Sequence, residues 1–258
     1  MMKIVYWTLG ALGVIVLVSI IDARVSAWAA QFDYGVFEAV RFVAYWPAYA
    51  LMSGVVGYLL VVFLPVYRGR ANAFAAVVFL VLMALFYEKT AEYFTLGSVS
   101  LLVFAALSVP GVMIGGKLAR RHGGWMRAFG VLAGYAGLVV GVQALKILVG
   151  RPRPGDGFEP WYAFEGMRLE SAMQSFPSGH TSFAGLVLGA LISLLGVKHP
   201  ATLTGAAWVV LVGFSSVATG NHYFSDVVFG GVLGAVSVLV GVWMVKEGVM
   251  RYGNPHSE

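Results

Sequence analysis

The sequence contains no cysteine among its 258 residues, and only 11% of them are Asp, Glu, Lys or Arg. Without cysteine there can be no disulfide framework, no thiolate-bound metal and no cysteine nucleophile. About one quarter of the residues in a typical soluble domain are charged, so the low charge content argues against an ordinary water-soluble enzyme. Long polar tracts are also missing, and aromatic residues make up 14% of the chain, which argues against intrinsic disorder.

Apolar residues, in contrast, make up 59% of the chain. Because one membrane span uses about 20 residues, the uninterrupted apolar stretches predict eight transmembrane helices. They are expected approximately at residues 4–21, 45–67, 72–87, 98–116, 126–149, 180–197, 202–219 and 223–245. We therefore predict an all-α fold, a polytopic transmembrane helical bundle of about eight spans.

Two features of these stretches leave alternatives open. The first stretch could be a cleaved signal peptide, but it is longer than the 7–15 apolar residues typical of one, which favours a retained helix. Small residues allow membrane helices to approach closely, either within one chain or between chains, so the oligomeric state stays open. The glycine pairs at four-residue spacing are Gly130/Gly134, Gly185/Gly189 and Gly230/Gly234.

The distribution of cations predicts the orientation. With an even number of spans both termini lie on one side of the membrane, and that side carries ten of the 17 Lys and Arg residues. By the positive-inside rule this side is cytoplasmic. The loop at 150–177 and the link before the last span then face the opposite side. We expect an integral protein of the bacterial inner membrane, with this face toward the periplasm and no nucleic-acid partner for the net charge of +5.

Three short segments gather on that face, and the first ends the span at 126–149. It contains Lys146, Arg151 and Arg153, each Arg followed by a proline. Cations beside an apolar helix are costly to desolvate, and several together suit an anion with more than one charge. Arg offers a fork of donors that matches phosphate oxygens, and Lys acts as a point charge. The alternative is that these side chains simply reach the membrane edge.

The second segment is Pro177-Ser178-Gly179-His180, which is typical of a helix start. Ser178 can cap the first turn, Gly179 removes side-chain bulk, and the exposed amides point toward an anion. His180 would lie within reach of that anion. The alternative is a capped helix with an interfacial histidine.

The third segment carries His222 and Asp226, four residues apart. On a helix such residues share one face, and a carboxylate beside an imidazole fixes its tautomer and stabilises its cation. A purely structural pair is the alternative. We expect no metal site, because only one carboxylate accompanies His180 and His222 and the nearby cations would repel a metal ion.

In this order, the three segments resemble the tripartite signature of the type 2 phosphatidic acid phosphatase superfamily, which also includes soluble acid phosphatases and vanadium haloperoxidases. The family pattern is Lys, six residues, Arg-Pro; then Pro-Ser-Gly-His; then Ser-Arg, five residues, His, three residues, Asp. Lys146 to Pro154 fits the first element, Pro177 to His180 the second, and His222 with Asp226 the end of the third. The resemblance covers about residues 140–235.

The resemblance implies that His222 attacks phosphorus to form a phosphohistidine, that Asp226 orients it, and that His180 protonates the leaving alcohol and later activates water. No metal or cofactor takes part in this scheme. The substrate implied is a lipid phosphate or pyrophosphate. The residues implied to hold the phosphate are Lys146, Arg153, Ser178 and Gly179, to which we add Arg151.

The same resemblance implies a division of the chain. Residues 126–246 would form the catalytic helical core, and residues 1–125 would be N-terminal transmembrane helices without an assignable motif, added to the six-span arrangement of the family. Residues 247–258 would be a cytoplasmic tail.

One residue departs from the family pattern, because Ser216 stands where the third element has arginine. Losing a charge-assisted contact to the transition state costs about 2–4 kcal/mol. Arg151 or Arg168 could substitute, or Asn221 could donate a neutral hydrogen bond. The loss also leaves two alternatives open, a lipid head-group phosphotransferase and a catalytically silent lipid-phosphate-binding protein. A transporter is disfavoured, since no charged residue lies near the middle of a span. The lipid itself is not specified by the sequence.

Overall fold

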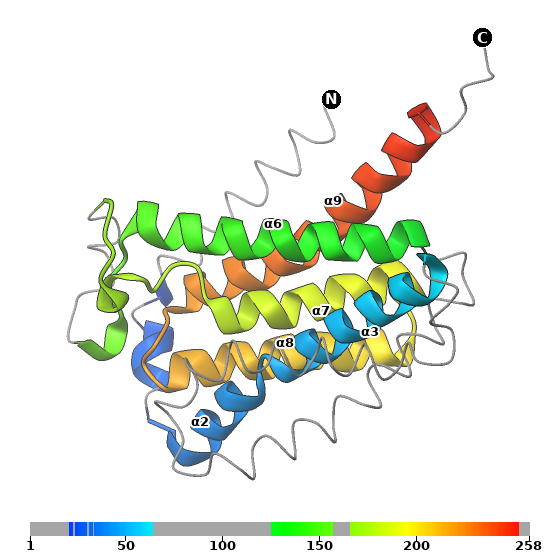
Figure 1. Cartoon of the computed structure of the whole chain (residues 1–258). Helices are drawn as coiled ribbons and strands as arrows, with labels where there is room; N and C mark the ends of the chain where they lie inside the picture. Colours follow the sequence, from blue (N-terminus) through cyan, green and yellow to red (C-terminus); the bar gives the residue numbers. More distant parts are fainter. Residues whose placement is uncertain are drawn as a thin grey trace.

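The computed structural model contains only helices, turns and irregular segments in the part of the chain that it describes (Figure 1). This confirms the all-α prediction for that part. The expected spans at 72–87 and 98–116, and nearly all of the one at 4–21, lie outside the described residues, so the total of eight stays a prediction. The described residues are 21–22, 24–29, 31–32, 34–63, 125–156 and 166–252.

Four long helices form the centre of the bundle. Three of them, together with the stretch Gly35–Val56, are long and apolar enough to cross a membrane, whereas the fourth, α7, is apolar but has 17 residues. They match the last four predicted spans to within a few residues, except that α9 continues into the segment expected to be a tail. The four helices are α6 (Trp125–Val149), α7 (Gly179–Leu195), α8 (Pro200–Ala218) and α9 (Phe224–Tyr252).

Local chemistry determines where these helices begin and end. The hydroxyl of Ser178 accepts from the amide of Thr181 and caps α7, as predicted. Gly196, with φ of 90°, ends this helix in a conformation that favours glycine. Pro200 then opens α8 at its first turn, where a proline has no backbone bond to lose.

Helix α9 packs against α6, α7 and α8, and glycines make the close contacts possible. A Cβ on Gly185 would overlap the backbone of Gly231, and one on Gly234 would overlap the carbonyl oxygen of Ser182. A Cβ on Gly134 of α6 would lie 2.7 Å from Cα of Val238. The glycine pairs that the sequence left open therefore serve packing within the chain.

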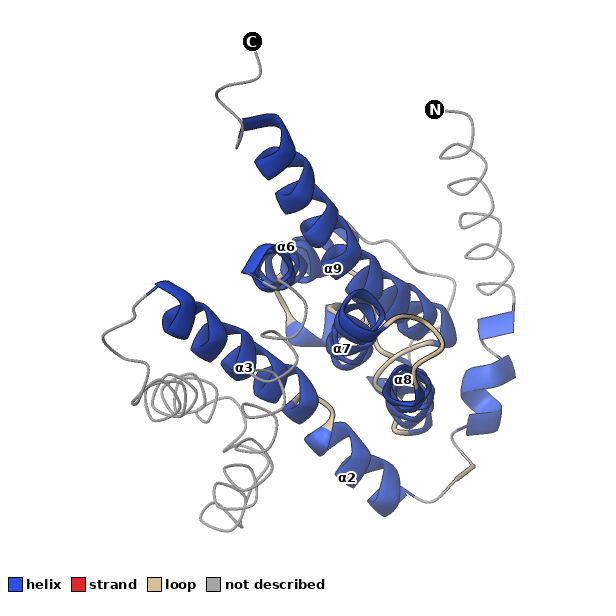
Figure 2. Ribbon diagram, turned by 90° about the vertical axis from the view of Figure 1, so that its right-hand side faces the viewer, coloured by secondary structure: helices blue, strands red, loops and turns tan. Residues whose placement is uncertain are grey.

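Two further helices cover one flank of this group, α2 (Tyr34–Val43) against α8, and α3 (Trp46–Phe63) against α6 and α7 (Figure 2). Helix α3 corresponds to the span expected at 45–67. Helix α2 was not predicted, because its residues fall between two expected spans and include charged side chains.

The chain direction brings the motif segments together. Helices α6 and α8 end, and α7 and α9 begin, at the same end of the bundle (Figure 1, left). The connection from α6 to α7 adds two single turns of 3-10 helix, η2 (Pro154–Asp156) and η3 (Ser171–Met173). The candidate site therefore lies at this end.

Candidate active site

His222 lies in the short link between α8 and α9, and only 2% of it is exposed. Its Nδ1 is 2.7 Å from the carbonyl oxygen of Ser175. A carbonyl can only accept, so Nδ1 carries the proton and Nε2 keeps a lone pair. The backbone amide of His222 donates to the carbonyl of Ser216 at 3.2 Å, which holds the link against the end of α8.

Burial, together with the charges of Lys146 and Arg153, lowers the pKa of His222 to about 4, although Asp226 opposes this shift. The imidazole is therefore neutral near pH 7. A neutral ring with its proton on Nδ1 presents the Nε2 lone pair to an electrophile, as a nucleophilic histidine must.

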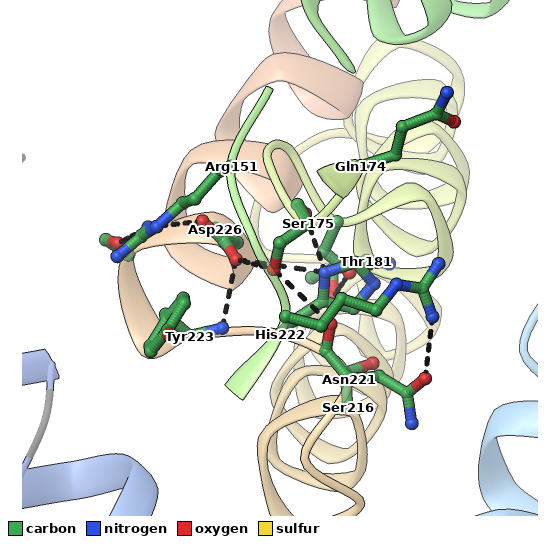
Figure 3. A network of polar contacts seen from close by, with 12 residues as sticks. Arg151, Gln174, Ser175, Thr181, Ser216, Asn221, His222, Tyr223 and Asp226 are labelled. Carbon is green, nitrogen blue, oxygen red and sulfur yellow. Dashed lines mark hydrogen bonds and ion pairs between the residues drawn. The ribbon is translucent and has the colours of Figure 1, made fainter. Parts of the chain in front are cut away.

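Asp226 does not hydrogen bond to His222 directly, since its Oδ2 lies 3.8 Å from Nδ1. Instead, Oδ2 accepts from the hydroxyl of Ser175 at 2.6 Å, and Ser175 lies between Asp226 and His222 (Figure 3). The amide of Tyr223 also donates to Oδ2, at 2.9 Å, so Asp226 closes the first turn of α9 as the acidic half of a capping box. A carbonyl thus fixes the tautomer, where we had expected the carboxylate to do so.

Arg151 is held in the protein interior, with 6% of its side chain exposed. Its guanidinium donates to Asp226 Oδ1 at 2.5 Å and to Asp22 Oδ2 at 3.0 Å, and lies 4.1 Å above the ring of Tyr223. Asp22, which the sequence did not single out, also accepts from the amide of Ser225 at 2.6 Å. Because two buried carboxylates hold Arg151, we no longer assign it to the phosphate.

Lys146 and Arg153 are only partly buried and are bonded to neutral groups. Lys146 Nζ donates to the carbonyl of Gln174 at 3.0 Å. Arg153 donates through Nη1 to Asn221 Oδ1 at 2.8 Å and through Nε to the carbonyl of Ser171 at 3.1 Å. Two cations held at one end of the bundle suit an anion with more than one charge.

Ser178 and Gly179 support the site through the backbone. Ser178 is fully buried, its hydroxyl caps α7, and its amide donates to the carbonyl of Asp226 at 3.1 Å. A Cβ on Gly179 would lie 3.2 Å from Tyr45 Oη and 4.0 Å from Lys146 Cε, so a side chain there would crowd the site. The amides of Gly179 and His180, in the first turn of α7, have no acceptor within the helix and can bind an anion.

Comparison with known proteins agrees with this arrangement. Residues 124–249 match the model of the PAP2 superfamily, that is, the type 2 phosphatidic acid phosphatases. The chain carries a PAP2 domain. The domain contains α6 to α8, all but the last residues of α9, and all three motif segments.

Two curated relatives are similar over this domain, and both are named lipid A 1-phosphatase. The protein from Rhizobium johnstonii is 33% identical over 119 residues, 45% of this chain and 46% of the relative. The protein from Rhizobium etli is 31% identical over 119 residues, 45% of this chain and 49% of the relative. The chain thus spans about half the length of the curated relatives it matches. No solved structure matches it significantly.

The position at which this PAP2 domain departs from the family pattern lies at the end of α8. Ser216 is fully buried, and its hydroxyl donates back to the carbonyl of Val212 at 2.8 Å. Arg168, which we had considered as a substitute, is exposed on the connection between α6 and α7. Asn221 uses its Nδ2 on the carbonyl of Thr219 at 3.0 Å and its Oδ1 on Arg153. Asn221 therefore positions Arg153.

One aromatic neighbour of the PAP2 domain was missed by sequence reasoning. Tyr45, in the turn between α2 and α3, places its ring centroid 4.6 Å from that of His180 and 4.9 Å from that of Phe183. It packs beside the His180 ring. No motif could have indicated it, because the contact joins residues far apart in the sequence.

The described ranges contain no group of three His, Asp or Glu side chains with the spacing of a metal site. Asp22 and Asp226, the two carboxylates nearest the histidines, are both bonded to Arg151. The donors that face the site are instead cations and amides, which select an anion.

Proposed function

We propose that the protein is an integral membrane phosphatase that removes phosphate from a lipid phosphate through a phosphohistidine on His222. The observation that carries the proposal is the state of His222, a neutral ring with its proton held on the Ser175 carbonyl and its Nε2 lone pair available. The charges of two cations, Lys146 and Arg153, act on this ring. A protein that only bound a lipid phosphate would need the cations, but it would not need a neutral histidine oriented to act as a nucleophile.

In the first step, Nε2 of His222 attacks phosphorus, an N–P bond forms, and the bond from phosphorus to the lipid oxygen breaks. The negative charge of the bound phosphate favours the protonated form of His180, which gives its proton to that oxygen as the lipid leaves as an alcohol. The phosphorylated imidazole is now a cation. The Ser175 carbonyl accepts from its Nδ1–H, and the carboxylate of Asp226 lies 3.8 Å away to stabilise the charge.

In the second step, the neutral His180 takes a proton from water, and the water oxygen attacks phosphorus. The N–P bond breaks, inorganic phosphate leaves, and both histidines return to their starting states. During both steps, Lys146, Arg153 and the amides of Gly179 and His180 stabilise the negative charge on the phosphoryl oxygens. All of these groups come from the domain matched at residues 124–249.

The substrate class follows from the apolar bundle and the relatives. Helices long enough to cross a membrane favour a substrate whose phosphate is part of a lipid head group. Since both curated relatives are named lipid A 1-phosphatase, we propose lipid A as the first substrate to test. We also propose, from the distribution of loop cations, that the site faces the periplasm.

The test is phosphate release by the purified full-length chain from lipid A, phosphatidic acid, phosphatidylglycerol phosphate and undecaprenyl pyrophosphate in mixed micelles. We expect His222→Ala to lower turnover by at least about 1000-fold, since it removes the nucleophile. His199→Ala is the matched control, because His199 is an exposed histidine that begins α8 at the other end of the bundle. Equal release by wild type and His222→Ala would refute the mechanism, and release only with an added acceptor alcohol would indicate a transferase.

A further inference from the structure

A second buried arginine approaches the same end of the bundle from outside the family match. Arg41 lies on α2, and 11% of its side chain is exposed. Its Nη1 contacts Oε1 of Glu38 at 2.9 Å, and the Glu38 side chain is 45% exposed. The proposed mechanism does not use this arginine.

Helix α2 packs against α8 next to the position where the family pattern is broken. The hydroxyl of Ser215 donates to the carbonyl of Phe37 at 2.7 Å, which joins α8 to α2. Phe37 is one helical turn before Arg41, and Ser215 is adjacent to Ser216. An arginine at 216 would extend from α8, and Arg41 extends from the helix that lies against that part of α8.

The charge of Arg41 reaches the reacting groups. Among the cations that act on the His180 imidazole, Arg41 has the largest effect, ahead of Lys146 and Arg153. Arg41 also has the largest charge effect on the phenol of Tyr45, whose ring lies 4.6 Å from His180. Tyr45 is four residues after Arg41, so this end of α2 lies on the His180 side of the site.

The hydrogen bonding of Arg41 is incomplete. Among the described residues its buried Nε has no hydrogen-bond acceptor, as is also true of Arg151 Nε, but Arg41 has only the half-exposed Glu38 as a carboxylate partner there. A buried donor without an acceptor is unfavourable, so a ligand oxygen that supplies one would be bound there. A phosphoryl oxygen is an acceptor that matches the guanidinium fork.

We propose that Arg41 takes the role of the arginine that Ser216 has replaced, contacting the phosphate of the substrate and stabilising its transition state. This inference rests on the proposed function. It places part of the phosphate site on α2, outside the segment at 124–249 that carries the three motifs.

The test uses four variants of the full chain in the phosphate-release assay. Arg41→Ala should lower kcat/KM about 100-fold, as loss of one donor to the transition state does, and should weaken inhibition by orthovanadate. The kcat/KM of Arg41→Lys should lie between those of Arg41→Ala and wild type, because lysine keeps the charge but loses the paired donors of the guanidinium. Glu38→Gln breaks the ion pair but keeps the cation, so it should stay near wild type. Arg24→Ala, an exposed arginine near the N-terminus, is the matched control.

A double variant that moves the arginine from position 41 to position 216 gives the most specific test. In Arg41→Ala, the second change Ser216→Arg should restore at least about 10-fold of the lost kcat/KM, since it returns an arginine to the family position. Failure of this rescue in a folded protein, or a loss in Glu38→Gln as large as in Arg41→Ala, would overturn the inference. Wild-type kcat/KM and vanadate inhibition in Arg41→Ala would overturn it as well.

His222→Ala separates this inference from the proposed function. If His222→Ala is inactive and Arg41→Ala is fully active, only the role of Arg41 is refuted. If His222→Ala keeps its activity, the proposed function fails first. The melting temperature of each variant, measured in the same detergent, shows which of them are folded.

Discussion

Replacing Arg151 by alanine should destabilise the fold, where a phosphate-binding role would have reduced substrate affinity alone. The Arg151 side chain is 6% exposed, and its partners Asp22 and Asp226 are exposed by 1% and 0%. The substitution would leave both carboxylates in the interior without their cation. It would also remove the cation from the ring of Tyr223, 4.1 Å away.

The magnitude follows from these contacts. Removing one partner of a buried ion pair costs about 3–5 kcal/mol, and a desolvated cation–π contact contributes about 0.5–2 kcal/mol. We therefore expect Arg151→Ala to lose roughly 4–6 kcal/mol of the free energy of unfolding. A typical domain has about 5–15 kcal/mol in total, so the variant should be close to unfolding. Arg168 is an exposed arginine of the same connection, so Arg168→Ala should change the free energy of unfolding by about 0.5 kcal/mol or less.

The assay is denaturant unfolding of the purified chain in detergent, followed by helical circular dichroism, with KM measured on the folded fraction. Combining Arg151→Met with Asp22→Asn removes one buried charge of each sign. The double variant should therefore lose less free energy of unfolding than the sum of the losses in Arg151→Met and Asp22→Asn. If Arg151→Ala unfolded at the wild-type midpoint and only its KM rose, the guanidinium would face the substrate and our interpretation would be wrong.

Two further predictions concern the pH profile and the helix packing. Because His222 reacts as the neutral ring and has a pKa of about 4, the acid limb of kcat/KM should lie near pH 4, while a fall at high pH would report the loss of the His180 proton. Lys146→Gln removes a charge that lowers this pKa, so its acid limb should move to higher pH, and an unmoved limb would contradict the assignment of that limb to His222. Gly234→Ala should cost at least about 1–3 kcal/mol, because its Cβ would overlap the Ser182 carbonyl. Gly141→Ala has no atom within 4 Å of the new Cβ, so it should be neutral or stabilising by up to about 1 kcal/mol. Equal melting temperatures of Gly234→Ala and Gly141→Ala would argue against close packing at Gly234.

Helices α6, α8 and α9 could be predicted from the sequence because each is a long apolar run bounded by polar residues, proline or glycine. The start of α7 was predictable too, since Ser178 is a strong capping residue just before an apolar run. Helix α2 was not, because it mixes Glu38 and Arg41 with apolar residues over only ten positions. A short amphipathic segment between two apolar runs looks like a loop when its packing partner is unknown.

The spacing of His222 and Asp226 predicted a direct contact for a reason that does not hold here. Residues four apart face each other only inside a helix, and α9 begins at Phe224, after His222. The two side chains come within 3.8 Å, but the link between them passes through Ser175. Ser175 lies 47 residues before His222 in the chain, and nothing in its own neighbourhood indicates the role.

The family spacing distinguishes Arg153 from Arg151, but the role of Arg151 could not be predicted from the sequence. Its partner Asp22 lies 129 residues before it. Tyr45 and Arg41 likewise reach the site from positions before the domain matched at 124–249. The family match therefore covers the three motifs but not the full set of groups around His180. A chain reduced to that domain would keep both histidines, but it would lose one of the two carboxylates that hold Arg151, the aromatic ring beside His180 and the buried arginine of α2.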